Sequence, residues 1–509
     1  MYRMRIDSRT FLLLLVFGLF LGSVPGIQAK QNQPTIKDSK IAQAIETELL
    51  TDDSVSAHLI DVEVEDGIVD LSGTIDNILA KDRATKIAES IKGVRAVTNR
   101  ITVKPPKRDD ASIEQDIQQA FQEDPATDSY EVDVNVDDGQ VTLRGTVDSW
   151  AEKSLCGEVA KSVTGVKSLQ NNIRISYAAE RLDNKIATEI RRRLESDVWV
   201  NSYLLDVEVG DGKVELSGAV GSAAEKRRAA SLAWVSGVVD VDSTDVDVDW
   251  WARDKMQRRQ IYADLSDKEI EQAVRDAFLY DPRVFSFQPD IEVNDGVVTL
   301  SGEVGNLKAK RAAEQDAENT LGVWRVKNHI RVRPTAYVSD AEIEDRIDKA
   351  MERNAYTYRP EITPVVVNGK VYLYGTVDSE FEKEQAEEVV SKVKGVIEVE
   401  NHIDVDFTWT YKTDWEIKED IQSELWWSPF VDSDEITVTV DNAEAKLSGT
   451  VDTWGEAQAA IDNAYEGGAR SVVNDLKVRY GPRYYRPGTT AYGAPGYEYL
   501  DYYDYYQAP

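Results

Sequence analysis

The chain has 509 residues, of which 42% are hydrophobic and 30% are charged, a composition typical of a folded protein rather than a disordered or membrane-embedded one. Its formal net charge of −33 argues against binding to nucleic acid, because such binding depends on lysine and arginine neutralising phosphates. One cysteine and three histidines argue against disulfide frameworks, zinc fingers, iron–sulfur clusters and histidine-rich metal sites.

The first 29 residues have the parts of a secretory signal peptide. Arg3, Arg5 and Arg9 precede an apolar run from Phe11 to Leu21, and a small residue, Ala29, ends the segment. The run is shorter than the roughly 20 residues that span a bilayer. We therefore predict cleavage after Ala29 and a periplasmic or secreted protein without a transmembrane span in the mature chain. Retention of the segment as an anchor is the alternative.

The rest of the chain repeats one unit six times. Each unit contains a turn residue, and these are Gly67, Gly139, Gly212, Gly296, Gly369 and, in the sixth unit, Ala443. A second glycine follows six residues later, at Gly73, Gly145, Gly218, Gly302, Gly375 and Gly449. Such a constant register is the signature of a repeat architecture.

Within each unit, the hydrophobic pattern changes from helical to strand spacing. The first unit opens with Ile41, Ile45 and Leu49 on one face of a helix, and alternating apolar residues then flank a two-residue turn at Asp66 and Gly67. A second helix and a last strand complete the unit. The sequence predicts an α+β fold, a tandem array of six small α-β-β-α-β modules, each a three-stranded mixed sheet with two helices on one face.

Three local roles follow from this pattern. We expect three polar residues to cap the opening helices of their units, namely Asp38, Asp110 and Ser266. The turn glycines suit a backbone with positive φ. The second glycines fall on the buried face of the hairpin, where the lack of a side chain would let a helix approach closely. Asn442 and Ala443 replace the usual turn residues in the sixth unit, so we expect a strained or altered hairpin there.

The order of elements, with Asp-Gly-x-Val-x-Leu-x-Gly-x-Val and a later Gly-Val-x3-Asn, resembles the BON domain, named for bacterial osmotically induced and nodulation-related proteins. The resemblance covers roughly residues 36–479. It implies a binding or structural module of exported osmotic-stress proteins, with phospholipid or other periplasmic components as ligands and with no catalytic residues or cofactors.

The register sets the module boundaries. The predicted segments are a signal peptide at 1–29, modules at 36–104, 110–177, 180–248, 266–334, 338–407 and 413–479, a linker at 249–265, and a disordered tail at 480–509 rich in tyrosine, glycine and proline. The linker is basic and aromatic in an acidic protein, and its candidate membrane or partner contacts are Trp250, Trp251, Arg258 and Arg259. The simpler interpretation is a helix whose tryptophans cap a neighbouring core.

No residue pattern indicates catalysis. Cys156 occupies a position that is alanine in the other five units, as expected for a buried and unreactive thiol. His329 and His402 share one position of the last strand, which is typical of a tolerant surface site. The turns supply too few carboxylates for a calcium loop. The sequence therefore predicts a protein that is not an enzyme and uses no cofactor or metal.

The leading hypothesis is an exported, envelope-associated binding or scaffold protein, related to osmotic stress or with a chaperone-like role. Its partners would be phospholipid headgroups or envelope proteins, bound by repeated weak contacts. The alternative is an extracellular structural or adhesive protein that uses the tail, which holds 10 of the 23 tyrosines.

Overall fold

The structure is a computed structural model, in which the described residues from Lys37 onward form one compact unit. It describes residues 36–55, 59–127, 130–178, 181–250, 265–334, 336–358, 362–405, 412–479 and 489–491. The predicted signal peptide, Trp251, Arg258, Arg259 and most of the tail lie outside these residues. None of the described helices is long and apolar enough to cross a bilayer.

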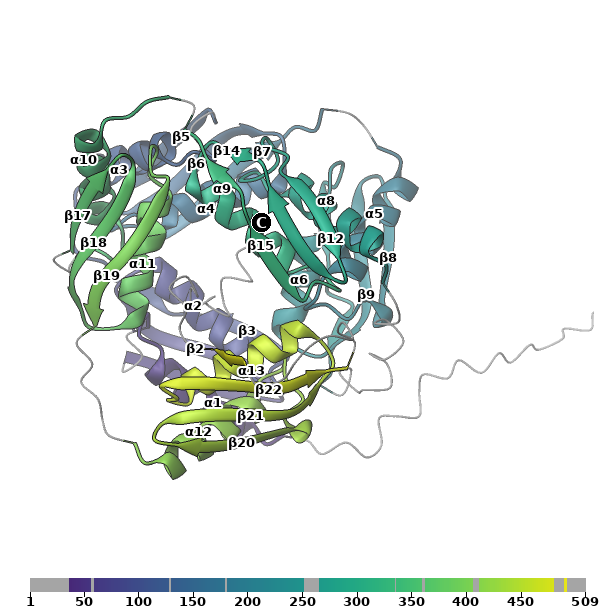
Figure 1. Cartoon of the computed structure of the whole chain (residues 1–509). Coiled ribbons are helices and arrows are strands. Elements are labelled where there is room, and N and C mark those ends of the chain that lie inside the picture. Colours follow the sequence, from purple (N-terminus) through teal and green to yellow (C-terminus); the bar gives the residue numbers. More distant parts are fainter. Residues whose placement is uncertain are drawn as a thin grey trace, which may run out of the picture. The chain divides into compact units, whose positions relative to one another are not determined.

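The predicted α+β architecture is confirmed: the chain is built from small modules of the order α-β-β-α-β (Figure 1). In each module the two hairpin strands are antiparallel, and the second of them pairs in parallel with the last strand, as β1, β2 and β3 show. Parallel pairing requires a crossover connection, which the second helix provides. Both helices contact the sheet, and in module 5 α11 covers one of its faces (Figure 1).

The first helices have the same length, 14 residues, in all modules: α1 (Asp38–Thr51), α3 (Asp110–Glu123), α5 (Asp183–Ser196), α8 (Asp267–Tyr280), α10 (Asp340–Arg353) and α12 (Asp414–Trp427). The second helices are α2 (Ile78–Glu89), α4 (Trp150–Lys161), α6 (Ala223–Leu232), α9 (Leu307–Glu318), α11 (Glu380–Ser391) and α13 (Trp454–Glu466). Two short 3-10 turns, η3 (Ser202–Leu204) and η5 (Ser433–Glu435), precede hairpins.

The hairpins are formed by β1 (Ile60–Glu65) and β2 (Ile68–Ile75), β5 (Val132–Asp137) and β6 (Gln140–Val147), β8 (Leu205–Gly210) and β9 (Lys213–Val220), β12 (Asp290–Asn294) and β13 (Val297–Ser301) with β14 (Glu303–Val304), β17 (Ile362–Val367) and β18 (Lys370–Val377), and β20 (Ile436–Asp441) and β21 (Glu444–Val451). The last strands are continuous or split: β3 (Ala96–Asn99) with β4 (Thr102–Val103), β7 (Ser168–Ile175), β10 (Asp240–Asp242) with β11 (Val246–Val248), β15 (Arg325–Asn328) with β16 (Arg331–Val332), β19 (Glu398–Val405) and β22 (Ser471–Val478).

One short strand lies in the tail, where we expected no regular structure. Strand β23 (Thr489–Ala491) pairs antiparallel with β22 and extends the sheet of module 6 to four strands. Three backbone positions of β22, from Val472 to Asn474, take part. The pairing uses the edge that the last strand otherwise leaves open.

The hairpin turns have the backbone that the sequence predicts. Asp66 and Gly67 have φ of 51° and 74°, the positive values of a tight hairpin turn. The sixth turn keeps the same register, with Asp441 opposite Glu444, although Ala443 takes a φ of 60° that disfavours a residue with a side chain. The hairpin there is strained at one residue and otherwise unaltered.

A buttress of the turn, missed in the sequence, recurs in all six modules. The carboxylate of Asp38 accepts hydrogen bonds from the backbone N–H groups of Asp66 and Gly67, both at 3.0 Å. Its counterparts do the same in the other modules, and they are Asp110, Asp183, Asp267, Asp340 and Asp414. A constant spacing of 29 residues between the aspartate and the second turn residue is the signal that could have revealed it.

This buttress corrects two of the expected helix caps. Asp38 and Asp110 are the first helical residues, and the preceding residues, Lys37 and Asp109, occupy the cap positions. A carboxylate in the first turn is still favoured by the helix dipole, but it is also needed at the hairpin. Ser266 does cap its helix, in a capping box with Glu269.

We expect Asp38→Ala to destabilise module 1 by about 1–2 kcal/mol, because two charge-assisted hydrogen bonds to the turn are lost. Hydrogen exchange of the Gly67 amide should accelerate accordingly. Ser39→Ala, an exposed neighbour on the same helix, is the control and should leave that exchange unchanged. Equal exchange in both variants would show that the carboxylate does not hold the turn.

The second glycines have a close neighbour other than the expected one. A Cβ on Gly73 would lie 2.0 Å from the carbonyl oxygen of Leu59, at the start of the hairpin, whereas we expected a helix there. Gly218 and Gly449 face the equivalent carbonyls of Leu204 and Glu435 at 2.0 and 1.9 Å. These glycines therefore let the first strand enter the hairpin close to the second one.

Each sheet buries the face that its helices cover. In module 5, Ile347 of α10, Leu373 of β18 and Val390 of α11 are fully buried in one hydrophobic cluster. The same cluster includes Leu307, from α9 of module 4. The modules therefore share part of their cores, which is consistent with the small core that about 70 residues can supply alone.

Candidate functional site: the junctions between modules

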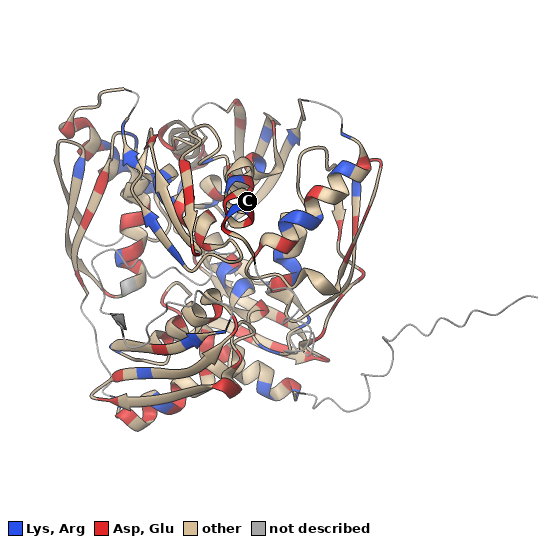
Figure 2. Ribbon diagram, turned by 45° about the vertical axis from the view of Figure 1, so that its right-hand side comes forward, with Lys and Arg blue, Asp and Glu red and all other residues tan. Residues whose placement is uncertain are grey.

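The second helices of different modules are joined by ion pairs. Lys161 of α4 contacts Asp82 of α2 at 2.7 Å. Arg227 of α6 pairs with Glu89 of α2, and Arg311 of α9 pairs with Glu387 of α11. Acidic and basic positions are interspersed along the helices of the ribbon (Figure 2). The charged faces of the second helices thus contact one another and are not simply solvated.

A backbone contact between modules is repeated three times with the same geometry. A glycine follows the second helix of each module, and in three modules it is Gly93, Gly165 and Gly322. The residue before this glycine donates its N–H to the carbonyl of the last residue in the first helix of another module. The three bonds run from Lys92 to Trp427 at 2.9 Å, from Thr164 to Arg353 at 2.7 Å and from Leu321 to Ser196 at 2.7 Å. They join modules 1 and 6, 2 and 5, and 3 and 4.

Two of these junctions are reciprocal. Ala355 donates back to the carbonyl of Ser162 at 2.8 Å, and Val198 donates to that of Asn319 at 3.1 Å. The result is a short antiparallel bridge in each case. Backbone hydrogen bonds satisfy the last carbonyls of the first helices, which have no partner within the helix.

A buried ion pair links modules 2 and 4. Lys308 Nζ lies 2.6 Å from a carboxylate oxygen of Asp124, and the two side chains are 7% and 5% exposed. Burial lowers the pKa of Lys308, although the Asp124 carboxylate acts in the opposite direction. Each charge therefore depends on the other to remain in this environment.

Tryptophans occupy several junctions. Trp199 of module 3 donates from Nε1 to Oδ1 of Asn319 at 2.8 Å and meets the ring of Phe430 of module 6 edge-on, with centroids 5.4 Å apart. Trp150 and Trp234 stack with centroids at 5.6 Å, which joins modules 2 and 3. Aromatic pairs of this kind stabilise by more than their buried area alone.

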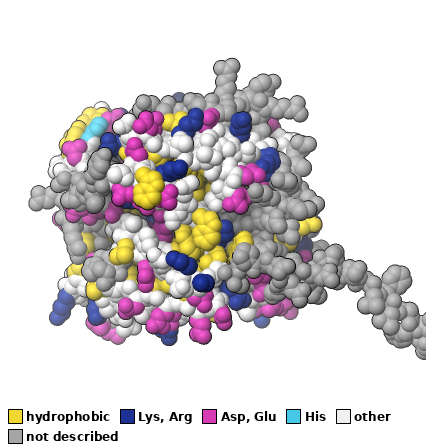
Figure 3. Space-filling model, turned by 90° about the horizontal axis from the view of Figure 1, so that it is seen from below, with side chains coloured by type: hydrophobic (Ala, Val, Ile, Leu, Met, Phe, Trp, Pro, Cys, Tyr) yellow, Lys and Arg dark blue, Asp and Glu magenta, His cyan; other side chains and the backbone are white. Residues whose placement is uncertain are grey.

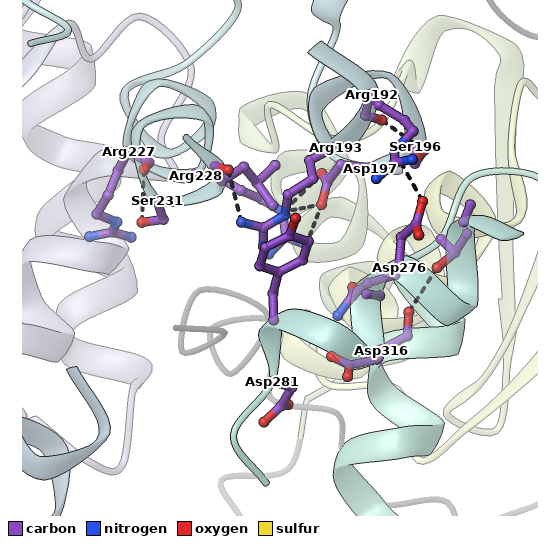
Figure 4. A pocket seen from close by; sticks show the side chains of 16 residues that line it. Arg192, Arg193, Ser196, Asp197, Arg227, Arg228, Ser231, Asp276, Asp281 and Asp316 are labelled. Carbon is purple, nitrogen blue, oxygen red and sulfur yellow. Dashed lines mark hydrogen bonds and ion pairs between the residues drawn. The ribbon is translucent and has the colours of Figure 1, made fainter. Parts of the chain in front are cut away.

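A small cavity of about 80 Å³ lies between modules 3 and 4 (Figure 4). Most charges around it are paired: Arg228 binds Asp197 through two nitrogens, and Arg192 lies 3.0 Å from Asp276. Asp316 is buried, and its Oδ2 has no hydrogen-bond partner among the described residues. Burial and the neighbouring Asp281 carboxylate raise the pKa of Asp316 well above its usual range.

The chemistry available in this cavity is that of paired charges. Burial lowers the pKa of Arg193 to about 10, and its guanidinium lies over the ring of Tyr280 at 4.2 Å. The two serines of the lining, Ser196 and Ser231, donate their hydroxyls to helix carbonyls, and no histidine or cysteine is among the lining residues. The described residues of the cavity therefore hold the junction and offer no activated nucleophile.

Two carboxyl groups face each other where modules 1 and 6 meet. Glu48 of α1 and Glu424 of α12 form a hydrogen bond between their side chains. Burial and this bond raise the pKa of Glu48 well above its usual value, and burial raises the pKa of Glu424 to about 7. A proton shared by the two carboxyls is required for this contact.

We expect this contact to make the protein less stable as the pH rises from about 4.5 to about 7. In that window the folded chain holds protons that the unfolded chain has lost, so raising the pH favours unfolding. Glu424→Gln should flatten the dependence of the melting temperature on pH. Glu419→Gln, an exposed change on the same helix, should leave it in place. An unaltered pH profile in the first variant would contradict a shared proton.

The predicted contact residues are only partly described. Trp250 lies beside module 1, where the ammonium of Lys92 sits 5.3 Å from its ring and 5.0 Å from that of Trp426. Module 6 exposes Trp415 by 68% and Trp426 by 41%. Hydrophobic side chains gather near the centre of the face shown in Figure 3, beside positively charged ones. Because Lys92 of module 1 lies over both Trp250 and the module 6 residue Trp426, Trp250 takes part in a contact between modules.

Of the other singled-out residues, Cys156 lies near the junction pair of Asp124 and Lys308, whose charges both act on its thiol. Cys156 is buried with a free thiol, and burial raises its pKa to about 12. His329 and His402 are exposed on their last strands. Among the residues that the structure describes, no group of three or more histidine, cysteine or acidic side chains has the arrangement of a metal site.

Sequence reasoning missed the junction residues, although one signal was present. The residue after the first helix is polar in every module, 15 positions before the turn residue, and these residues are Asp52, Asp124, Asp197, Asp281, Asn354 and Ser428. All four aspartates form ion pairs, with Arg83, Lys308, Arg228 and Arg283 respectively, and the pair of Asp124 with Lys308 joins two modules. The signal is therefore a polar residue directly after the apolar stripe of the first helix, repeated in all six modules.

Comparison with known proteins agrees with this repeated architecture. The family description "BON domain" matches residues 37–105, 109–177, 182–249, 266–334, 339–406 and 413–480. Osmotically-inducible protein Y of Escherichia coli (strain K12) is 30% identical over 144 residues, which are 27% of this chain and 72% of that protein.

Two solved structures of CdsD, a structural protein of the type III secretion system of Chlamydia trachomatis, match with 14% and 12% identity and TM-scores of 0.11 and 0.12. They cover 41% and 42% of this chain and 91% and 98% of their own, and scores this low carry no argument. The six matched segments together span most of the chain. The chain belongs to the BON domain family, with six copies of the domain.

Proposed function

We propose that this protein is a stress-related binding scaffold of the cell envelope, without enzymatic activity. The observation that carries the proposal is the repeated backbone junction, which joins modules 1 and 6, 2 and 5, and 3 and 4. Ion pairs between the second helices connect these three pairs of modules to one another. The sheets keep one face exposed to solvent, as the alternating burial of β1 and β5 illustrates. Several exposed faces on one body suit multivalent contacts.

The envelope location and the relation to osmotic stress are supported by similarity to osmotically-inducible protein Y and by the predicted signal peptide. The ligands we propose are envelope proteins in the first place and phospholipid headgroups in the second. The net charge of −33 weakens attraction to anionic lipid, which favours protein partners.

Affinity capture with the tagged full chain, from envelope extract of the host, tests the proposal. We expect envelope proteins to be retained in a manner that a large excess of untagged chain abolishes. Sedimentation with phospholipid vesicles, and suppression of the aggregation of a denatured client, separate lipid binding from a chaperone-like role. Absence of specific capture, of sedimentation at low salt and of client protection would together overturn the proposal.

A further inference from the structure

The exposed face of the module 5 sheet differs from its counterparts. Val365 and Val367 of β17 are 42% and 50% exposed, and Tyr374 of β18 is 45% exposed. Val365 pairs across the hairpin with Tyr372, and Thr363 pairs with Tyr374. These side chains form one continuous apolar and aromatic surface on the side of the sheet away from its helices, which we call the module 5 face.

The other modules carry polar or small residues at these positions. The counterparts of Val365 are Glu63, Asn135, Glu208, Glu292 and Thr439, and those of Tyr374 are Ser72, Arg144, Ser217, Ser301 and Ser448. The fold therefore does not need apolar residues there. Since exposed apolar side chains that fall together on one face commonly mark an interaction site, this departure indicates a contact specific to module 5.

The aromatic part of the face is ordered by stacking. His402 of β19 lies parallel to Tyr374, with ring centroids 5.4 Å apart and planes 19° apart, and parallel to Tyr372 at 6.3 Å and 7°. Lys370 lies 5.5 Å from the Tyr372 ring. Rings held in this way present a fixed surface, so little side-chain entropy is lost when a partner docks.

The charges beside this surface specify the chemistry of the partner. Strand β19 contributes Glu398, Glu400 and Asp404 along the same face, and Lys370 pairs with the first two. The strand thus borders the apolar part with an excess of negative charge. A second copy of this chain would bring the same carboxylates and a net charge of −33, so it is a poor partner.

We propose that the module 5 face binds a basic polypeptide segment in which apolar side chains alternate with lysine or arginine. Valines and tyrosines would take up the apolar side chains, and the β19 carboxylates would meet the positive ones. This inference rests on the proposed binding function and assigns it a surface and a partner class.

The test uses the full chain and two fluorescent peptides, one alternating valine with lysine and one alternating valine with glutamate. We expect the lysine peptide to bind, the glutamate peptide to bind at least about tenfold more weakly, and salt to weaken the first interaction. The combined variant Val365→Thr with Tyr374→Ser removes apolar surface without adding charge, and it should lose about tenfold in affinity. It introduces the residues that module 6 carries at the same positions, Thr439 and Ser448, so folding should be preserved.

Val239→Thr is the matched control, since Val239 of module 3 is 60% exposed and lies outside the module 5 face. It should bind the lysine peptide as the unmodified chain does. Equal binding of the two peptides, or undiminished binding by a folded double variant, would overturn the assignment. If that variant still captures envelope proteins, the proposed function survives and only this surface is wrong.

Discussion

Replacing Asp124 with alanine is expected to destabilise the protein by about 3–5 kcal/mol, because the buried ammonium of Lys308 loses its only close carboxylate contact that the structure describes. The pKa of Lys308 is already lowered by burial. Without its partner, the lysine must either lose its proton or draw water into the junction between modules 2 and 4. Denaturant unfolding, followed by tryptophan fluorescence, measures the loss.

Two comparisons separate the ion pair from general damage. Asp124→Leu combined with Lys308→Met should recover much of the stability, since replacing both buried charges by apolar groups is often neutral or favourable. Asp345→Ala breaks an exposed pair with Lys349 on α10 and should cause no measurable change. A double variant as unstable as Asp124→Ala would show that packing, rather than charge, is what the junction needs.

The modules could be predicted from the sequence because their information is local. Helix stripes such as Ile41, Ile45 and Leu49, and the alternation around Gly67, depend on residues within one helix or one hairpin. Six repetitions reinforced each position. The buttress from Asp38 to Gly67 needed only the spacing of 29 residues, which is as constant as that of the glycines.

The junctions could not be predicted, because they join residues that no short pattern connects. Asp124 and Lys308 are 184 positions apart, and Arg353 and Glu123 are 230 apart. Pairing of modules 1 and 6, 2 and 5, and 3 and 4 depends on residues that vary from copy to copy. A repeated pattern identifies the residues that all modules have in common. The pairing of particular modules depends instead on residues that vary among the modules.

The same logic extends to the module 5 face. Its valines and tyrosines satisfy the strand pattern as well as the acidic residues of other modules do, so periodicity alone passes over them. Their significance appears once exposure is known and the counterparts are compared. The exposed residues of this face differ from their counterparts in the other modules, whereas the core residues of module 5 keep the common pattern. This difference indicates that the exposed residues serve binding rather than folding.

A glycine series provides the sharpest test of the hairpin itself. Gly73→Ala is expected to destabilise module 1 by about 3 kcal/mol or more, because a φ of +123° strains a residue with a side chain and the new Cβ meets the Leu59 carbonyl at 2.0 Å. Gly302→Ala shares the strain, with a φ of +113°, but its closest neighbour is 3.8 Å away. It should lose only the 1–3 kcal/mol or so that backbone strain costs.

Gly210→Ala completes the series, since its Cβ would meet nothing within 4 Å and its φ lies outside the positive range. Its stability should change by no more than about 0.5 kcal/mol. Hydrogen exchange resolved by module keeps the three effects apart in a chain of six similar units. The order Gly73, Gly302, Gly210 follows from the approach of one carbonyl and the sign of one dihedral angle. Equal losses of stability in the Gly73 and Gly302 variants would show that backbone strain is the sole cause and that the contact with the Leu59 carbonyl contributes nothing.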